Sequence, residues 1–320
     1  MHRCKGVSVL YITLLLAAFV LPQSAHAGFV LGVGGDATNF AVLYEGNGQQ
    51  MQFNNSFLTG NIGIGAVNGT TGSFQGNGPG TITGNIEFDT ANTGQFSNSG
   101  LTITGSVTYS NSNVDADLAA MTGLNQLSKN LGLETGTSTT ISTGGSINAS
   151  NGILDGSGNR VFTVSSIGFP NGTFTINGSA SDYVVLNVAG NVGSNGLNGS
   201  IVLAGGITSD HVLINYTPAT SNLTNYNNDY TNLTGAPTLT ISTNGATTTG
   251  TFLDPAGNIQ INHSVLDGRL FGGDTQNLSI VSGATIVAPP SPTPEPAHTA
   301  FALALMLGIA LAARKKLIRS

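Results

Sequence analysis

The sequence predicts a mostly β protein, a β-solenoid of the parallel β-helix type with one flanking α-helix. Its central part is rich in Gly, Asn, Thr and Ser, among which short runs of Val, Ile and Leu alternate with polar residues, as in half-buried strands. These runs return with a loose period of roughly 20 to 25 residues, which is typical of stacked solenoid turns. One stretch follows helical spacing instead. Apolar segments with cationic flanks stand at both ends of the sequence, and they predict export.

Residues 1–27 are predicted to be a secretory signal peptide. Two cations precede an apolar core at residues 7–21, and Ala25 and Ala27 form an A-x-A cleavage site. The only cysteine of the sequence, Cys4, lies inside this segment. The exported chain would then carry no thiol, which excludes disulfides and thiolate metal sites.

Residues 28–288 are expected to form one domain, because their composition is uniform and no proline-rich linker divides them. Of the 15 acidic residues, all but Glu295 lie in this body, and three cations oppose them, so its formal charge is 3 − 14 = −11. Such a surface repels phosphate backbones, and we expect no nucleic-acid partner. The three cations are Lys129, Arg160 and Arg269.

Two segments define the expected solenoid turn. Residues 81–88 and 102–109 share one pattern with an offset of 21 residues, in which alternation directs Ile82 and Ile86 inward and the threonines outward. The glycine at their shared position, Gly84 in the first copy, predicts a corner where a Cβ would clash. A β-sandwich is the competing architecture, because it also has a strand every ~8–12 residues. Further strands are expected at residues 61–64, 161–164, 173–176, 183–188, 200–203, 212–216, 238–242, 250–253, 258–261, 265–271 and 278–281.

The segment at residues 114–131 predicts an amphipathic helix. Asn113 supplies an N-cap and Gly132 can end the helix. The apolar stripe should lie along the β body. Its members follow i, i+4, i+7 spacing and are Val114, Leu118, Met121, Leu124, Leu127 and Leu131.

The last part of the chain is predicted to enter the membrane. Residues 289–296 form a proline-rich spacer, and residues 297–320 form a transmembrane helix with a basic end. At ~1.5 Å rise per residue the apolar run would be ~25 Å long, the short end of a membrane span. Lys/Arg-rich flanks stay on the cytoplasmic side. The basic end consists of Arg314, Lys315, Lys316 and Arg319.

This order of parts, a Pro-Glu-Pro at residues 294–296, a short apolar span and a basic end, resembles the PEP-CTERM sorting signal of exosortase substrates. The sorting residues implied are Pro294, Glu295 and Pro296 together with the basic end. The resemblance implies two partners, the Sec translocon and an exosortase-type processing enzyme. It also implies transient anchoring in the inner membrane of a Gram-negative bacterium, followed by release to the cell surface or extracellular matrix. A permanent tail anchor is the alternative.

The body resembles a second family through five short motifs that come in one order. That order is similar to the choice-of-anchor A family of bacterial surface proteins, although Asp254 stands where alanine would be usual. The resemblance implies an adhesive β-solenoid with a helix beside it, and it carries no catalytic residue. The motifs are residues 161–164, 185–190, 212–216, 250–255 and 266–273.

Few residues suggest a catalytic site or a metal site. His211 and His263 have no ligand partner at metal-binding spacing, and we expect no metal and no cofactor. Calcium at a Gly/Asp turn, such as residues 272–274 or 254–258, is the alternative. Acidic residues could serve a polysaccharide hydrolase or lyase if they came within ~5–10 Å of each other in a groove. The candidates are Glu87 with Asp89, and Asp254 with Asp267 and Asp274.

Thr-x-Thr runs raise one further class of function, because threonine arrays on a solenoid can match ice or a crystalline polymer. Only two of the four runs keep the 21-residue offset, which argues against a regular array, and threonine is in any case a good strand residue. The runs are Thr81/Thr83, Thr102/Thr104, Thr173/Thr175 and Thr238/Thr240.

We therefore expect a non-enzymatic surface or matrix protein that works through adhesion or biofilm exopolysaccharide association. Its Asn, Thr, Ser and Tyr side chains can exchange hydrogen bonds with a glycan. A polysaccharide-active enzyme and a binder of ice or another crystal surface remain the alternatives.

Overall fold

The computed structural model describes residues 37–44, 49–67, 70–89, 95–109, 126–169, 171–189, 196–217, 238–273 and 277–289. The chain divides into two compact units, residues 1–289 and residues 290–320. The second unit lies wholly outside the described ranges, as do the predicted signal peptide, its cleavage residues Ala25 and Ala27, and the sorting signal. Within the described ranges, no helix is long and apolar enough to cross a membrane.

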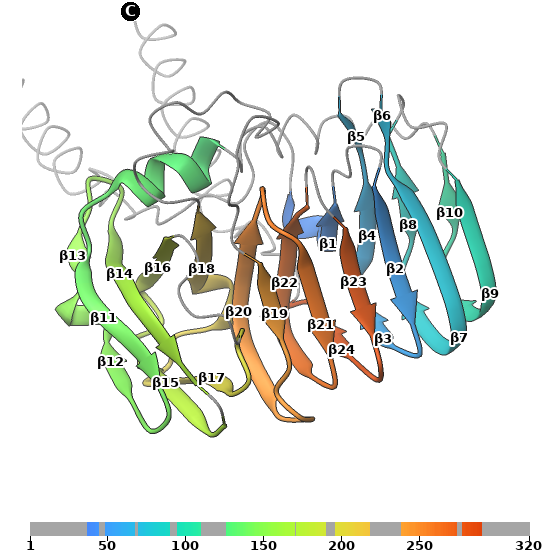
Figure 1. Ribbon diagram of the computed structural model, residues 1–320. Helices are drawn as coiled ribbons and strands as arrows, with labels where there is room; N and C mark the ends of the chain where they lie inside the picture. The colour runs from blue at the N-terminus through green and yellow to red at the C-terminus, as the bar shows by residue number, and fades with distance from the viewer. Residues whose placement is uncertain are drawn as a thin grey trace, which may run out of the picture. The chain divides into compact units, whose positions relative to one another are not determined.

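Apart from two short antiparallel pairings, the described strands stack side by side in parallel (Figure 1), and their pairings define the three faces of a solenoid. We call the face on which the helix packs the helix face. Its strands, in spatial order, are β10 (Val107–Thr108), β8 (Ile86–Phe88), β4 (Asn61–Ile64), β1 (Phe40–Tyr44), the second halves of β22 (Val265–Gly272) and β20 (Thr247–Asp254), then β18 (Val212–Thr217), β16 (Tyr183–Ala189), β14 (Asn159–Gly168) and β11 (Thr137–Ser142).

We name the other two faces the amide face and the threonine face, after the side chains on their outer sides. The amide face consists, in order, of the first halves of β9 (Phe96–Ile103) and β7 (Ser73–Thr83), then β2 (Gln50–Asn54), β23 (Leu278–Val281), β21 (Ile259–Asn262) and β19 (Leu239–Ile241). The threonine face consists of the ends of β9 and β7, then β3 (Phe57–Thr59), β24 (Thr285–Val287), the first halves of β22 and β20, β17 (Ser200–Ala204), β15 (Thr173–Asn177) and β12 (Ser146–Asn148).

One turn of the solenoid is built from both ends of the described chain. Strand β1 lies between β22 and β4, β24 lies between β22 and β3, and β23 lies between β21 and β2. Figure 1 accordingly shows the orange C-terminal strands next to the blue N-terminal ones. We call this the composite turn. The N-terminal turns extend from one side of it and the remaining turns from the other.

Short elements complete the fold. Two pairings are antiparallel, that of β5 (Ala66–Val67) with β6 (Thr70–Thr71) and that of β13 (Ile153–Leu154) with the start of β14. Three 3-10 turns precede or connect strands, and they are η1 (Ala37–Asn39), η2 (Ala149–Asn151) and η3 (Ser209–His211).

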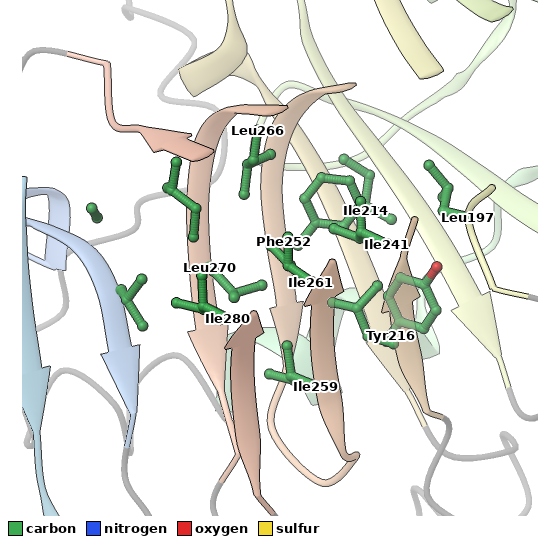
Figure 2. Packing of buried hydrophobic residues seen from close by; sticks show 14 of the residues in the cluster. Leu197, Ile214, Tyr216, Ile241, Phe252, Ile259, Ile261, Leu266, Leu270 and Ile280 are labelled. Atoms are coloured by element: carbon green, nitrogen blue, oxygen red, sulfur yellow. The ribbon is translucent and has the colours of Figure 1, made fainter. Parts of the chain in front are cut away.

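The interior is filled by aliphatic and phenylalanine side chains, which alternate with mostly polar outward residues along the strands of the amide and threonine faces. Phe252, Leu266 and Ile280 come from three different faces and are fully buried in one cluster. Figure 2 shows these side chains converging between the strands. Burial of each such side chain stabilises the fold by about 1.5–3 kcal/mol. The predicted inward residues Ile82 and Ile86 are likewise 0% exposed.

The predicted glycine corner is confirmed at Gly84. Its φ is +153°, and a Cβ at this position would lie 2.0 Å from the carbonyl oxygen of Gly60, which stands at the same corner of the neighbouring turn. Asparagine side chains continue this stack. The Asn61 carboxamide oxygen accepts from the amide of Asn85, and the Asn85 oxygen accepts from the amide of Ser106, both at 3.0 Å.

The described part of the helix spans residues 126–133 and packs on the helix face. The predicted end at residue 131 is wrong. Gly132 lies within the helix, and the amide of Glu134 still donates to the carbonyl oxygen of Leu131 at 3.1 Å. Leu131 is 5% exposed and packs in the apolar cluster of the helix face, and the helix continues through Gly132 and Leu133. The predicted N-cap Asn113 and the first turns lie outside the described residues.

The β-solenoid prediction is confirmed for the described residues, and the β-sandwich is excluded because the stacked strands are parallel. Strands at residues 61–64 and 278–281 match their predicted bounds. The strand predicted at residues 183–188 is β16, which is covered on both its inner and its outer side.

Candidate functional site

The helix face is closed to large ligands where the helix covers it. Asn215 and Asn187 are paired in register, and the Asn215 carboxamide donates to Asn187 Oδ1 and to the carbonyl oxygen of Ser128, both at 2.9 Å. Ser128 Oγ donates in return to Asn215 Oδ1 at 2.5 Å. Beside this polar network lies an apolar cluster of outward side chains that are nevertheless buried. Its described members include Leu43, Val185, Leu213, Leu253, Phe271 and, from the helix, Leu131.

The threonine face presents a regular array of outward side chains. Six consecutive strands contribute two positions each, and the strand register aligns these positions in two rows. Eight of the twelve positions are threonine. The first row reads Thr102, Thr81, Phe57, Thr285, Val265 and Thr247, and the second reads Thr104, Thr83, Thr59, Val287, Asp267 and Thr249.

The spacing of this array follows from β geometry. Neighbouring strands lie ~4.8 Å apart, and residues two positions apart on one strand lie ~6.7 Å apart. The β-branched threonine side chain has few χ1 rotamers, so hydroxyl and methyl groups repeat in a fixed pattern. Three apolar side chains interrupt it, namely Phe57 at 52% exposure, Val287 at 40% exposure and the half-buried Val265, and Asp267 is the only charged residue among the twelve.

The expectation that the threonine runs would not form an array is wrong. Thr81/Thr83 and Thr102/Thr104 stack directly, and the composite turn inserts Thr59 and Thr285 beside them from opposite ends of the sequence. Because neighbouring strands at the composite turn come from opposite ends of the sequence, the array has no constant sequence offset between its threonines. Of the other two runs, Thr173/Thr175 lies farther along the threonine face on β15, whereas Thr240 lies on the amide face.

The amide face carries a different set of outward side chains, again in two rows. Six of its twelve positions are Asn or Gln, five are Ser or Thr, and one is Val. The first row reads Ser97, Gln75, Gln52, Ser279, Gln260 and Thr240, and the second reads Ser99, Asn77, Asn54, Val281, Asn262 and Ser242.

The structure separates Asp254 from Asp267, two of the acidic residues proposed for an enzyme. Asp254 is fully buried at the end of β20 on the helix face, whereas Asp267 is exposed on the threonine face. Glu87 is half-buried on β8, and Asp89 just after it is 2% exposed. Asp274 lies outside the described residues. The structure therefore does not bring Asp254 and Asp267 together at one groove, as glycoside hydrolysis requires.

Burial raises the pKa of the Asp254 carboxyl well above its ordinary value, although the backbone amide of Gly257 donates to Oδ1 at 2.9 Å. Burial and the neighbouring Asp254 also raise the pKa of the Tyr216 phenol. Both groups point into the protein, so neither offers an accessible acid or base.

The two histidines of residues 28–288 lie in turns. His211 ends η3 and stacks on Tyr183 with ring centroids 4.1 Å apart, and His263 sits exposed at a corner with φ +43°. Within the described ranges, no three His, Cys, Asp or Glu side chains group closely enough to hold a metal ion. A further Gly/Asp turn at residues 155–159 is closed by its own chain, since the amides of Ser157 and Asn159 donate to Asp155 Oδ1 at 2.8 Å.

No protein-family model matches the chain, and no curated protein is significantly similar to it in sequence. Solved structures with a similar backbone include an ice-binding protein from the Antarctic ascomycete Antarctomyces psychrotrophicus (15% identity, 82% of this chain and 100% of that one, TM-score 0.43). Others are an ice-binding protein from an Arctic yeast (13%, 85% and 99%, 0.48) and the DUF3494 domain of a Shewanella frigidimarina ice-binding protein (13%, 82% and 99%, 0.45). TM-scores below 0.5 assign the chain to no family. Its function is therefore inferred from the side chains on its helix, amide and threonine faces.

Proposed function

We propose that this protein is an exported, non-enzymatic binder of an ordered surface, and that the surface is ice, bound through the threonine face. The observation that carries this proposal is the strand register, which aligns eight threonines in two rows of six positions. Each threonine offers a hydroxyl that hydrogen-bonds and a methyl that excludes liquid water. Repeated at fixed spacing, these groups can engage many lattice positions of a crystal together.

Rigidity supports the proposal. The array lies on parallel strands that share one buried core, so binding orders few side chains that were previously free. Each contact is weak, but contacts made by one rigid body add as in multivalent binding. A flexible or irregular surface would lose this advantage.

Export is part of the proposal and depends on the ends of the sequence. The A-x-A site at Ala25 and Ala27 and the signal around Pro294, Glu295 and Pro296 would deliver the protein to the cell surface or matrix through the Sec translocon and an exosortase-type enzyme. The surroundings of a cell are where ice and other crystals form. The separation of Asp254 from Asp267 supports a non-enzymatic role.

Ice partitioning tests the proposal. The protein exported by cells that express the full chain is added to a solution from which ice is grown slowly. We expect enrichment in the ice fraction for the native protein and exclusion for Thr59→Asp with Thr83→Asp, which places two charges in the array. Gln126→Glu with Asn130→Asp adds the same charge on the helix, and this control should still enter the ice. Exclusion of the folded native protein would refute ice binding.

A further inference from the structure

We propose that the amide face is a second, independent binding surface, and that its ligand is a neutral polysaccharide. All twelve outward positions of this face are uncharged, whereas the body around them has a formal charge of 3 − 14 = −11. An anionic polymer would be repelled by the body and would find no cation in these rows. A neutral polymer meets neither obstacle.

The side chains of the amide face suit sugar hydroxyls. A carboxamide has two donor hydrogens and an acceptor oxygen, so one Gln or Asn can hydrogen-bond two adjacent hydroxyls of a sugar ring. Gln52, Gln75 and Gln260 share the first row, with Ser279 between Gln52 and Gln260. Neighbouring strands of the face lie ~4.8 Å apart, a distance comparable with the length of a sugar residue. A polysaccharide strand laid across the strands would meet a new polar side chain at each step.

Flexibility distinguishes this face from the threonine face. Glutamine has three side-chain torsions and adapts to a partner, whereas threonine holds its hydroxyl in a fixed place. The Gln52 carboxamide already donates to Gln50 Oε1 at 3.0 Å, so these amides lie over the strand rather than extending freely into solvent. An adaptable amide surface fits a flexible polymer, and a stiff threonine surface fits a lattice. The two faces therefore differ in ligand.

The test is affinity electrophoresis of the exported protein in native gels cast with hydroxyethylcellulose, dextran or, as the anionic comparison, alginate. We expect at least one neutral polymer to retard the native protein, and alginate not to do so. Gln52→Ala, Gln75→Ala and Gln260→Ala together should weaken the retardation at least tenfold in apparent dissociation constant. The control, Gln126→Ala with Asn130→Ala, removes two amides from the helix instead and should leave the retardation unchanged.

Folding and ice binding are checked on the same samples. The triple variant should keep the native unfolding midpoint and should still enter ice, because its substitutions are half-buried at the surface and lie outside the threonine face. The proposal would be overturned if neither hydroxyethylcellulose nor dextran retarded the native protein. It would also be overturned if the triple variant were retarded as strongly as the native protein. Concentration-dependent dimerisation that the triple variant abolishes would assign the face to a second copy of the chain instead. The retardation and dimerisation outcomes do not depend on whether the protein binds ice.

Discussion

The buried guanidinium of Arg269 donates through Nη2 to the backbone carbonyl oxygen of Thr38 at 3.0 Å, across 231 positions of sequence. The same nitrogen donates to the carbonyl oxygen of Pro289 at 2.9 Å. Thr38 lies just before β1 and Pro289 lies just after β24, which are two of the strands of the composite turn. One side chain thus joins both ends of the described chain at the turn that brings Thr59 and Thr285 into the threonine rows.

Arg269→Met should lower the free energy of unfolding by about 2–4 kcal/mol, because it leaves the half-buried carbonyl oxygens of Thr38 and Pro289 without this donor. Urea denaturation measures the change. Arg160→Met removes a half-buried arginine from β14 and should cost less than about 1 kcal/mol. Equal losses for the two variants would mean that Arg269 does not join the ends.

Asn215→Ala should loosen the helix from the solenoid and cost about 2–4 kcal/mol, because Ser128 and Asn187 lose their buried partner. Hydrogen exchange should accelerate at residues 126–133 before it does in the strands. Asn177→Ala, which removes an exposed bond to Asn148 at 3.1 Å, is the matched control and should leave exchange unchanged. Unchanged protection of the helix in Asn215→Ala would contradict the docking role.

Gly84→Ala should destabilise the protein by about 3 kcal/mol or more, since its Cβ would collide with the Gly60 carbonyl oxygen in a backbone conformation that disfavours side chains. Gly156→Ala is the control. A Cβ there meets nothing within 4 Å, and the expected change is within about 0.5 kcal/mol. Thermal unfolding of both variants decides the matter, and similar melting temperatures would show that the corner tolerates a side chain.

Asp254→Asn should stabilise the protein at neutral pH. Burial raises the folded-state pKa of this carboxyl above its unfolded value, so the folded state holds the proton more tightly. Stability is therefore highest below the unfolded pKa and falls as pH rises from there towards the folded pKa. Urea midpoints between pH 4 and pH 8 should decline less in Asp254→Asn than in the native protein. A native midpoint that declines no more steeply than that of the variant would contradict the burial argument.

The sequence predicted the repeating unit better than its assembly. Alternation placed Ile82 and Ile86 inside, and the glycine pattern marked the corner at Gly84, because both depend on residues close together in the chain. The composite turn depends on pairing between β1 and β22, some 230 positions apart, and nothing local encodes it. Thr59 and Thr285 were missed for this reason, since neither belongs to a Thr-x-Thr run. The register that aligns them is a property of the stack.

Interrupting residues give the most direct test of the threonine face. Phe57 and Asp267 occupy array positions without being threonine, and both are exposed, so Phe57→Thr with Asp267→Thr should raise the number of threonines from eight to ten of the twelve positions without loss of stability. The measurement is thermal hysteresis, the gap between the melting and freezing points of a crystal in the protein solution. Ice binding by this face predicts that the gap is largest for the variant with ten threonines, smaller for the native protein and absent for Thr59→Asp with Thr83→Asp. A gap that is the same in all three folded proteins, or absent from all three, would contradict it.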